Sequence, residues 1–416
     1  MRINYHSTNK LDGTSIQLPL SKSLSHRLFM LNALHDFPVA IPALSQSRDT
    51  TLFTQCLKSA TDYFNFLDAG TPARFALAYF AAKNRSITLD GNESLRRRSI
   101  APLVDALSMK GAKFEYLNED GFFPVKIIRG VNKNHPLFEA PWTVDSNESS
   151  QYASALMLIS SLEGFPQEIK VNGLDHSWSY IQMTQQILMR WGIHCSLQEG
   201  HISIDKNNIK FPQTIEIEAD WSSSAFFYLV SLISGQSLKF SGLKELSDQG
   251  DAIITNLFEG LGVKTTTSKN DISLIKSGLT ISNHAEFDAS EYPDLIPVLI
   301  STLVYLKIEA TIYGIENLKK KESNRIDSIN QNIKQLSSQL IDNHDGSYQL
   351  KIDREPHISK KLNILTNSDH RIAMAFAPWA CQIPSVYIDD WKCTEKSFPN
   401  FWNELQKCGY TLVKEI

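Results

Sequence analysis

The sequence predicts an α/β protein with two domains, each made of three repeats of one α/β unit. A chain of 416 residues is too long for a single hydrophobic core and suggests two domains of roughly 200 residues each. Six segments share a polar or glycine-rich entry followed by an apolar helix rich in small residues. In most repeats a second helix then closes on a glycine and leads into a strand.

The six apolar helices define the repeat. They are apolar on nearly all sides, which indicates burial inside a domain. Their starts lie 72 to 79 residues apart, except for the first two, which are 49 residues apart. We therefore expect the first unit to lack its strand-rich end, unless the repeat is aligned in the wrong phase. The six entries are Ser21, Gly70, Ser149, Ser222, Asp294 and Asp369.

The second helices and the strands follow a local pattern. A glycine just past a helix, followed by alternating apolar residues, indicates a C-cap that leads into a strand. The segments with this pattern are LVDALSMKGAKFEY, MTQQILMRWGIHCSL, IITNLFEGLGVKTTT and FWNELQKCGYTLV. Further runs predict strands of the sheets: QEIKVNG, QTIEIEAD, SLKFSG and ATIYGI.

The composition excludes several classes of protein. A net charge of −4 without a basic stripe argues against a nucleic-acid partner. No run of about 18 apolar residues predicts a membrane span, and the first residues lack the apolar run of a signal peptide. The five cysteines are scattered without metal-ligand spacing, which supports neither a zinc site nor a disulfide framework. We expect a cytoplasmic protein that binds small molecules, and a monomer, because no apolar stripe predicts an obligate dimer.

The entries of the apolar helices are candidate anion-binding sites. The start of a helix presents unpaired N–H groups and the positive end of its dipole. At the first entry, Lys22 lies in the opening turn, and Ser23 and Arg27 share one helix face. The alternative is an ordinary capped helix with solvated cations.

Further candidates occur at the other entries of the first half of the chain. A glycine at residue 70 lets a ligand approach bare backbone N–H groups, although an ordinary turn would also explain it. Arg96, Arg97 and Arg98 form a run of charge, and two of the three are expected to be solvated. Serines at helix starts are most often simple N-caps. The candidates are Gly70, Arg98, Ser149, Ser150, Gln151, Ser177 and Tyr180.

The second half of the chain contributes charged residues at three helix starts. Asp294 precedes a helix and would serve there as a cap. An apolar stripe of Ile326, Ile329, Ile333, Leu336 and Leu340 predicts a helix through residue 340. On its first turn, Glu322 and Arg325 either contact a ligand or form an i,i+3 ion pair. Arg371 opposes the dipole of its helix, which suggests a ligand, and Lys396 follows a later turn.

These features together predict a cleft between the two domains. Six similar helix starts, several with Lys or Arg placed against the dipole, are poorly explained as unrelated caps. The simplest interpretation is that they converge on a substrate with several negative charges.

The motifs also resemble those of the enolpyruvyl transferases, most closely the branch that acts on shikimate 3-phosphate. The motifs follow one another from about Leu18 to Lys396: SKSLSHR, AGT, Arg98, SSQ, SWSY, YPD, KKKESNR, SDHRIAM and KCTEKSFP. The resemblance implies a two-domain fold, an inside-out α/β barrel of six βαβαββ-type units with the first unit shortened here. It also implies that residues 1–20 join residues 219–416 in one domain, that residues 21–218 form the other, and that a double-crossover hinge lies near residues 20 and 218.

The resemblance implies a reaction and the residues for it. The carboxyvinyl group of phosphoenolpyruvate moves to the 5-hydroxyl of shikimate 3-phosphate through a tetrahedral intermediate, without a metal or organic cofactor. Implied ligands of shikimate 3-phosphate are Ser23, Arg27, Ser149, Ser150, Ser177, Tyr180, Asp294, Asn317 and Lys321. Implied ligands of phosphoenolpyruvate are Lys22, Gly70, Arg98, Gln151, Arg325, Arg371 and Lys396. Asp294 is the implied base for the hydroxyl, Glu322 with Lys22 the implied proton carrier, and His370 shapes the site or packs behind it.

The chain departs from the family pattern at three positions. It has Leu20, Asp68 and Phe75 where the family usually has glycine, asparagine and proline. Asp68 adds negative charge beside the anion site and is expected to weaken phosphoenolpyruvate binding. The departures leave open a relative that binds substrate with reduced or lost turnover. A UDP-N-acetylglucosamine enolpyruvyl transferase is a further alternative, but Ser23 follows Lys22 and no cysteine lies near Arg98.

Overall fold

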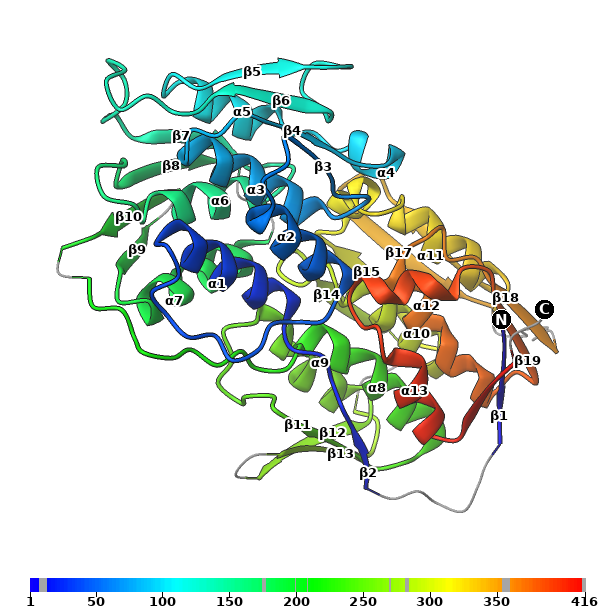
Figure 1. Ribbon diagram of the computed structural model, residues 1–416. Coiled ribbons are helices and arrows are strands. Elements are labelled where there is room, and N and C mark those ends of the chain that lie inside the picture. Colours follow the sequence, from blue (N-terminus) through cyan, green and yellow to red (C-terminus); the bar gives the residue numbers. More distant parts are fainter. Residues whose placement is uncertain are drawn as a thin grey trace. The chain divides into compact units, whose positions relative to one another are not determined.

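The chain folds into two compact units (Figure 1). One unit contains Met1–Leu20 and Glu218–Ile416, and the other contains Ser21–Ile217. The chain therefore passes between the units twice. This computed structural model describes residues 1–6, 13–173, 177–198, 200–207, 209–268, 271–280, 284–353 and 360–413.

The unit of residues 21–217 has two four-stranded sheets in its described part. The first has the order β3-β4-β6-β5, with β3 (Tyr63–Asn65), β4 (Ile87–Asp90), β5 (Lys113–Tyr116) and β6 (Val125–Arg129). The second has the order β7-β8-β10-β9, with β7 (Trp142–Asp145), β8 (Glu168–Asn172), β9 (His194–Gln198) and β10 (His201–Asp205). In each sheet the first two strands are parallel and the other neighbours are antiparallel.

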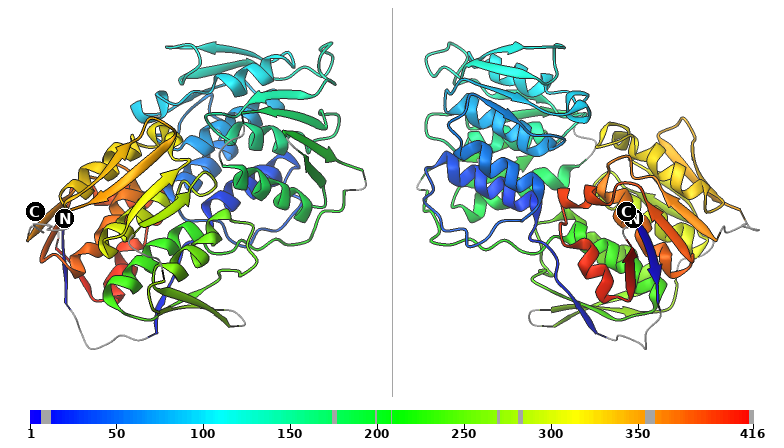
Figure 2. Two further views of the ribbon diagram at one scale, coloured as in Figure 1. Left: turned by 180° about the vertical axis from the view of Figure 1, so that it is seen from behind. Right: turned by 45° about the vertical axis from the view of Figure 1, so that its right-hand side comes forward.

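Three buried helices form the centre of this unit and contact one another. They are α1 (Lys22–Leu34), α3 (Gly70–Ala82) and α6 (Gln151–Ile159). Every residue of α1 from Leu24 onward is buried, as the apolar pattern predicts. The second helices of the repeats are α2 (Arg48–Lys58), α5 (Ala101–Ser108) and α7 (Trp178–Arg190), and α4 (Glu93–Arg96) is a single turn. The sheets lie outside the helices (Figure 2).

The other unit has three four-stranded sheets in its described part. The first, β2-β11-β13-β12, contains β2 (Thr14–Ile16), β11 (Leu238–Ser241), β12 (Val263–Ser268) and β13 (Asp271–Lys276). The second, β14-β15-β17-β16, contains β14 (His284–Asp288), β15 (Glu309–Tyr313), β16 (Ser338–Asp342) and β17 (Ser347–Ile352). The third, β18-β19-β1-β20, contains β18 (Lys361–Ile364), β19 (Ser385–Ile388), β1 (Arg2–Tyr5) and β20 (Tyr410–Val413).

The helices of this unit repeat the same plan. The central, mutually packed helices are α8 (Trp221–Ser234), α10 (Ile296–Leu306) and α12 (His370–Phe376). The second helices are α9 (Ile254–Gly260), α11 (Arg325–Lys334) and α13 (Phe401–Lys407). Short 3₁₀ turns occur at η1 (Gly250–Ile253), η2 (Glu316–Lys320), η3 (Ala377–Cys381) and η4 (Trp391–Lys396). All six central helices of the protein start within two residues of the predicted positions.

The N-terminal segment supplies one strand to each of two sheets. β1 lies between β19 and β20 and is antiparallel to both, with Ile3 opposite Val386 and Leu412. β2 pairs in parallel with β11. The fourth and sixth repeats are therefore completed by residues that precede the first crossing between the units.

The first repeat has two helices, α1 and α2, but no sheet of its own within the described residues. What remains is an isolated parallel bridge between Ala40 and Thr214. The predicted loss of the strand-rich end is confirmed. The predicted strand QTIEIEAD is wrong, because within the described residues this segment forms only single bridges, between Thr214 and Ala40 and between Ala219 and Leu20. Ile215 and Ile217 are nevertheless buried, so the alternation correctly indicates which side faces the core.

The helix predicted to run through residue 340 is present as α11, but its predicted end is wrong. α11 ends at Lys334, Ser337 has a φ of 55°, and Leu340 belongs to β16. Leu336 and Leu340 are buried here and would also be buried on the apolar face of a longer helix. Their spacing therefore could not distinguish such a helix from a turn followed by a strand. The four predicted glycine caps are confirmed, with φ between 80° and 95° at Gly111, Gly192, Gly262 and Gly409.

The five sheets are separate from one another. The helices lie inside and the sheets outside, but the sheets of the described part do not close into a barrel. In that part of the chain, no helix combines the length and the apolar character that a membrane crossing requires.

Candidate functional site

The residues predicted to form the site fall into two groups, one in each unit, and the structure adds Arg74 to the first group and Asp251 and Asp369 to the second. We call the first the anion-binding group, which consists of Lys22, Ser23, Arg27, Gly70, Arg74, Arg98, Ser149, Ser150, Gln151, Ser177 and Tyr180. We call the second the carboxylate network, which consists of Asp251, Asp294, Asn317, Lys321, Glu322, Arg325, Asp369, His370, Arg371 and Lys396.

Lys22 is the first residue of α1 and is held by an ion pair. Its Nζ lies 3.0 Å from Oδ2 of Asp49, which is on the first turn of α2. Ser21 caps α1, because its hydroxyl accepts the N–H of Leu24. The shortened first repeat thus still supplies a carboxylate that orients the lysine at the mouth of α1.

Arg27 is a buried cation that joins three helices. Its guanidinium donates to Thr184 Oγ1 at 2.8 Å, and to Ser154 Oγ and the carbonyls of Ser23 and Tyr180 at 3.2 Å each. Among the described residues, no carboxylate lies within ion-pair distance of it. Burial lowers the pKa of Arg27 to about 10. A buried cation without a counter-ion is costly, so this position favours an incoming anion.

Gly70 is the first residue of α3 and lies against two arginines. A Cβ atom at this position would lie 3.1 Å from Nη1 of Arg98 and 3.4 Å from Nη1 of Arg74. The glycine therefore leaves these guanidinium groups access to the bare backbone of the helix entry. Arg74 also donates to Oε1 of Gln151 at 2.7 Å, and Gln151 donates to Thr71 at 2.8 Å.

Arg74 and Arg98 share the unpaired character of Arg27. Arg74 donates to the carbonyl of Ser99, and Arg98 donates to the hydroxyl of Ser94. The buried Nε of each has no hydrogen-bond partner. No carboxylate of the described residues forms an ion pair with either one. Three arginines with uncompensated charge are therefore placed near the starts of α1, α3 and the helix after Arg98.

The other arginines of the charge run behave as predicted. Arg96 pairs with Asp90 at 2.7 Å and Arg97 with Glu93, and both side chains are exposed. Two of the three arginines are therefore structural or solvated.

Three serines of the group lie at the starts of α6 and α7. Ser150 occupies the N-cap position of α6 and is buried, but its side chain makes no capping bond, while Ser149 accepts the N–H of Gln151. Ser177 is the N-cap residue of α7 and has a φ of 64°, which is uncommon for a serine. Tyr180, one turn on, has its ring 5.9 Å from the guanidinium carbon of Arg27. Strained and uncapped positions of this kind are typical of ligand sites.

Arg325 is at the centre of the carboxylate network. It is fully buried and donates to Asp369 at 2.8 Å, to Glu322 at 2.8 Å and to Asp294 at 3.1 Å. Burial lowers the pKa of Arg325, but the three carboxylates outweigh this and raise it above its usual range. The i,i+3 ion pair considered for Glu322 and Arg325 is present. Arg325 therefore organises acids, unlike the unpaired arginines of the other unit.

Asp294 lies between two guanidinium groups. Arg371 Nη2 donates to its Oδ2 at 2.6 Å, and Arg325 Nη1 donates to its Oδ1. Burial raises the pKa of Asp294, but Arg371 and Arg325 hold it well below its usual range. The simple cap considered for Asp294 is not its role, because α10 begins two residues later and its carboxylate is engaged in ion pairs.

Asp251 is a second buried carboxylate beside this pair. Burial and the neighbouring charge of Asp294 raise the pKa of Asp251 to about 7, although Arg371 and a hydrogen bond from Ser222 act in the opposite direction. The pKa of Asp294 is thus lowered from the ordinary carboxylate value, and the pKa of Asp251 is raised from it. Such a pair can divide the roles of proton acceptor and proton donor.

The remaining predicted residues lie around the network. Lys396 Nζ is 3.9 Å from Oε1 of Glu322. His370 Nδ1 is 3.8 Å from Asp369. Asn317 is in η2, and its buried Oδ1 makes no hydrogen bond within the described residues. Lys321 directly follows η2 and adds to the positive charge that acts on Asp294.

Sequence reasoning assigned no role in the site to four residues that hold these groups in place, although Asp369 is one of the predicted helix entries. Asp49 and Arg74 orient Lys22 and Gln151, and Asp369 and Asp251 complete the network. A buried charge on an otherwise apolar helix was an available signal for Arg74. Asp49 and Asp251 had none, because their partners are distant in sequence.

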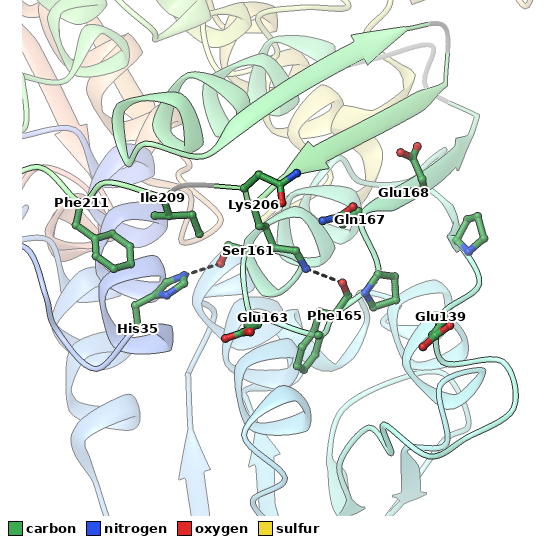
Figure 3. A pocket seen from close by; sticks show the side chains of 14 residues that line it. His35, Glu139, Ser161, Glu163, Phe165, Gln167, Glu168, Lys206, Ile209 and Phe211 are labelled. Atoms are coloured by element: carbon green, nitrogen blue, oxygen red, sulfur yellow. Dashed lines mark hydrogen bonds between the residues drawn. The ribbon is translucent and has the colours of Figure 1, made fainter.

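A hollow of about 770 Å³ lies at the opposite ends of two site helices (Figure 3). Its wall includes His35, which directly follows α1, and Ser161, which follows α6. Lys22 and Gln151 are the first residues of the same helices. The hollow is therefore separated from the anion-binding group by the length of these helices.

The charge of this hollow does not suit an anionic substrate. Glu139, Glu163 and Glu168 line it together with one lysine, Lys206. The ammonium of Lys206 already donates to the carbonyls of Leu162 and Phe165 at 2.8 and 2.6 Å. Three carboxylates against one engaged cation repel an anion such as phosphate.

Comparison with known proteins identifies the family. The model of EPSP synthase (3-phosphoshikimate 1-carboxyvinyltransferase) matches residues 59–405. The chain is 32% identical over 399 residues to a 3-phosphoshikimate 1-carboxyvinyltransferase of Bacteroides fragilis, covering 95% of each chain. It is 28% identical to one of Syntrophobacter fumaroxidans, covering 94% of this chain and 96% of the relative.

The fold agrees with solved structures. An EPSP synthase from Acinetobacter baumannii superposes with a TM-score of 0.72 at 18% identity, covering 99% of this chain and 100% of the other. The enolpyruvyl transferase NikO from Streptomyces tendae superposes with a TM-score of 0.69 at 13% identity, covering 99% and 98%. The predicted two-domain enolpyruvyl-transferase fold is confirmed. The chain belongs to the EPSP synthase family.

Proposed function

We propose that this protein transfers the carboxyvinyl group of phosphoenolpyruvate to the 5-hydroxyl of shikimate 3-phosphate and releases inorganic phosphate. This is a step of the shikimate pathway to chorismate and the aromatic amino acids. The observation that best supports it is the set of unpaired arginines Arg27, Arg74 and Arg98. The two substrates together bring two phosphates and two carboxylates, which would supply the missing counter-charges.

The anion-binding group would hold both phosphates. Arg98 and Gln151 lie beside Gly70 at the entry of α3, and Lys22 opens α1. We assign the phosphate of phosphoenolpyruvate to these three residues. The buried guanidinium of Arg27 has four of its five N–H groups engaged, and its charge is left for shikimate 3-phosphate. The further proposed ligands of shikimate 3-phosphate are Ser23, Ser149, Ser150, Ser177, Tyr180, Asn317 and Lys321.

The carboxylate network would move the protons. The 5-hydroxyl oxygen attacks C2 of phosphoenolpyruvate while its proton passes to Asp294 and the terminal carbon gains a proton. The bond between C2 and the phosphate oxygen then breaks, the terminal carbon loses a proton, and the double bond re-forms. We assign the proton traffic at the terminal carbon to Glu322 together with Lys22, since Glu322 lies between Arg325 and Lys396.

Asp294 is ionised in the free protein but weakly basic, because two arginines share its charge. A substrate carboxylate bound at Arg371, with Lys396 and Arg325 nearby, would bring negative charge close to Asp294. Added negative charge raises the pKa of a carboxylate. Binding of phosphoenolpyruvate would thus make Asp294 a stronger base when the hydroxyl is in place.

Both groups would have to act on one pair of substrates. The chain links the units at residues 20–21 and 217–218, and we propose that these two crossings form the hinge of a closing motion. Small-angle scattering should show compaction only when both ligands are present. No change in the radius of gyration with saturating ligands would contradict the closing motion.

Two alternative functions have weaker support. A transferase specific for UDP-N-acetylglucosamine would use a different acceptor in the same assay. A binding protein without turnover would bind shikimate 3-phosphate and release no phosphate. We further propose a monomer in the cytoplasm, since the substrates are small anions and the sequence predicts no dimer stripe.

The experiment follows phosphate release from phosphoenolpyruvate by the purified protein. Release should require shikimate 3-phosphate, and phosphorus NMR should show the carboxyvinyl product. UDP-N-acetylglucosamine in its place should give no release. Tight binding of shikimate 3-phosphate by calorimetry without any turnover would overturn the proposal, and Lys83→Met serves as a control variant outside both groups.

A further inference from the structure

Asp68 is a buried carboxylate next to the anion-binding group. It is 7% exposed and lies two residues before Gly70, where the guanidinium groups of Arg98 and Arg74 approach the helix entry. An unpaired buried carboxylate is expensive and would repel a phosphate that binds nearby. The chain therefore needs a device that cancels this charge.

Arg48 supplies the opposite charge. Its Nη2 lies 2.5 Å from Oδ1 of Asp68, and its side chain is about a third exposed. Arg48 is the first residue of α2, which is capped by Ser47. The ion pair joins the start of α2 to the loop that leads into α3.

The next residue of α2 makes the parallel connection. Asp49 pairs with Lys22 at the start of α1. The first turn of α2 thus makes two ion pairs. Arg48 pairs with Asp68, near Gly70, and Asp49 pairs with Lys22 of the anion-binding group. These two ion pairs connect the first turn of α2 to the entry of α1 and to the loop before α3.

We propose that Arg48 is a positioning residue for anion binding, which neutralises Asp68 and fixes the entry of α3 relative to the entry of α1. Arg48 acts through Asp68 and does not touch substrate. Without it, the carboxylate of Asp68 would compete with the substrate phosphate for the cations of the group. The inference rests on the proposed function, and it makes Arg48 and Asp68 one functional unit in which removal of both charges is tolerated better than removal of Arg48 alone.

The test is a double-mutant cycle in the phosphate-release assay. Arg48→Met, which keeps the length of the stem, should raise the KM for phosphoenolpyruvate about tenfold and change kcat by less than about threefold. Asp68→Asn alone should change the same KM by less than about threefold, because Arg48 is partly solvated. The double variant should return the KM to within about threefold of the unmodified protein.

Further variants separate charge from folding. Arg48→Lys keeps the charge and should keep the KM within about threefold. Inorganic phosphate should inhibit Arg48→Met less strongly, since it would meet the same unbalanced carboxylate. Lys83→Met breaks an ion pair of the same unit whose cation is similarly exposed but whose carboxylate, Asp36, is solvent-exposed, and it should leave all constants unchanged.

Two results would overturn the inference. If Arg48→Met and the double variant are equally impaired, Arg48 does not act through Asp68. If Arg48→Lys is as impaired as Arg48→Met, the charge is not what matters, and this arm holds even if the methionine variant folds poorly. Absence of turnover in the unmodified protein would instead be a failure of the proposed function.

Discussion

Asp294 accepts a hydrogen bond of 2.6 Å from Nη2 of Arg371, and this contact links a proposed base to a proposed substrate ligand. Replacing Asp294 by Asn keeps the shape and removes the base. We expect kcat to fall by about 10²- to 10⁴-fold, which is the usual contribution of a positioned acid or base. The KM for phosphoenolpyruvate should not rise, because Arg371 and Arg325 each lose a competing carboxylate. Steady-state phosphate release measures both constants.

The matched control for this change is Asp342→Asn. Asp342 also pairs with a cation in the same unit, Lys319 at 3.3 Å, but it lies in β16 outside the network. It should retain full kcat. Retention of kcat within about threefold by Asp294→Asn would contradict the assignment of the base.

Arg27 should be irreplaceable by lysine. A lysine keeps the charge but cannot form the forked contacts with Thr184, Ser154 and the Tyr180 carbonyl. We expect the KM for shikimate 3-phosphate to rise about 100-fold, since charge-assisted hydrogen bonds of this kind are strong. Chemical unfolding should show a loss of about 1–3 kcal/mol, because buried acceptors lose their donors.

Arg97→Lys is the matched control, because that guanidinium is exposed in the same unit. Its kinetics and stability should equal those of the unmodified protein. Unchanged shikimate 3-phosphate binding by Arg27→Lys would show that Arg27 only joins helices.

Some of the fold could be predicted because its determinants are local. A polar entry followed by an apolar run of small residues located all six central helices, and a glycine followed by alternation located four helix-to-strand turns. Strand pairing is not local. The alternation in QTIEIEAD indicated the buried side correctly, but no sequence pattern tells whether a neighbouring strand exists.

The candidate site shows the same limit. Lys22, Arg27 and Gly70 were identifiable because an unusual residue stands at a recognisable helix start. For Arg325 the sequence suggested one partner, Glu322 at i,i+3, but not the other two, because Asp294 and Asp369 are distant from it in sequence. Arg325 has three carboxylate partners and Arg27 has none within the described residues. That difference places Arg325 in the carboxylate network and supports the proposal that Arg27 binds an anion.

The raised pKa of Asp251 predicts a pH-dependent stability. The ordinary value is 3.8 and the folded value is about 7, owing to burial and Asp294, with Arg371 opposing and Asp220 adding to the shift. The carboxyl is protonated in both states below pH 3.8, so its contribution is fully present there. It is lost as pH rises toward 7, because the unfolded chain releases the proton first.

Asp251→Asn removes this titration. The unmodified protein should lose stability from pH 5 to pH 7, and the variant should not. The free energy of unfolding of the variant minus that of the unmodified protein should therefore increase by up to about 1.4 kcal/mol per pH unit, and then level off. Urea titrations at several pH values measure it. Asp345→Asn, an exposed carboxylate of the same unit, should show no such rise, and a flat difference for Asp251→Asn would refute the prediction.

β1 should be essential for the stability of its unit, although residues 21–217, which form the other unit, separate it in sequence from β19 and β20. Ile3 is fully buried between β19 and β20, so Ile3→Ala opens a cavity at the centre of a sheet. We expect a loss of about 2–5 kcal/mol in the free energy of unfolding. Ile275→Ala, on β13 of the same unit, removes the same atoms from a half-exposed position and should cost less than about 1 kcal/mol. Urea unfolding followed by tryptophan fluorescence measures both, and equal losses would show that β1 contributes no more than a surface strand.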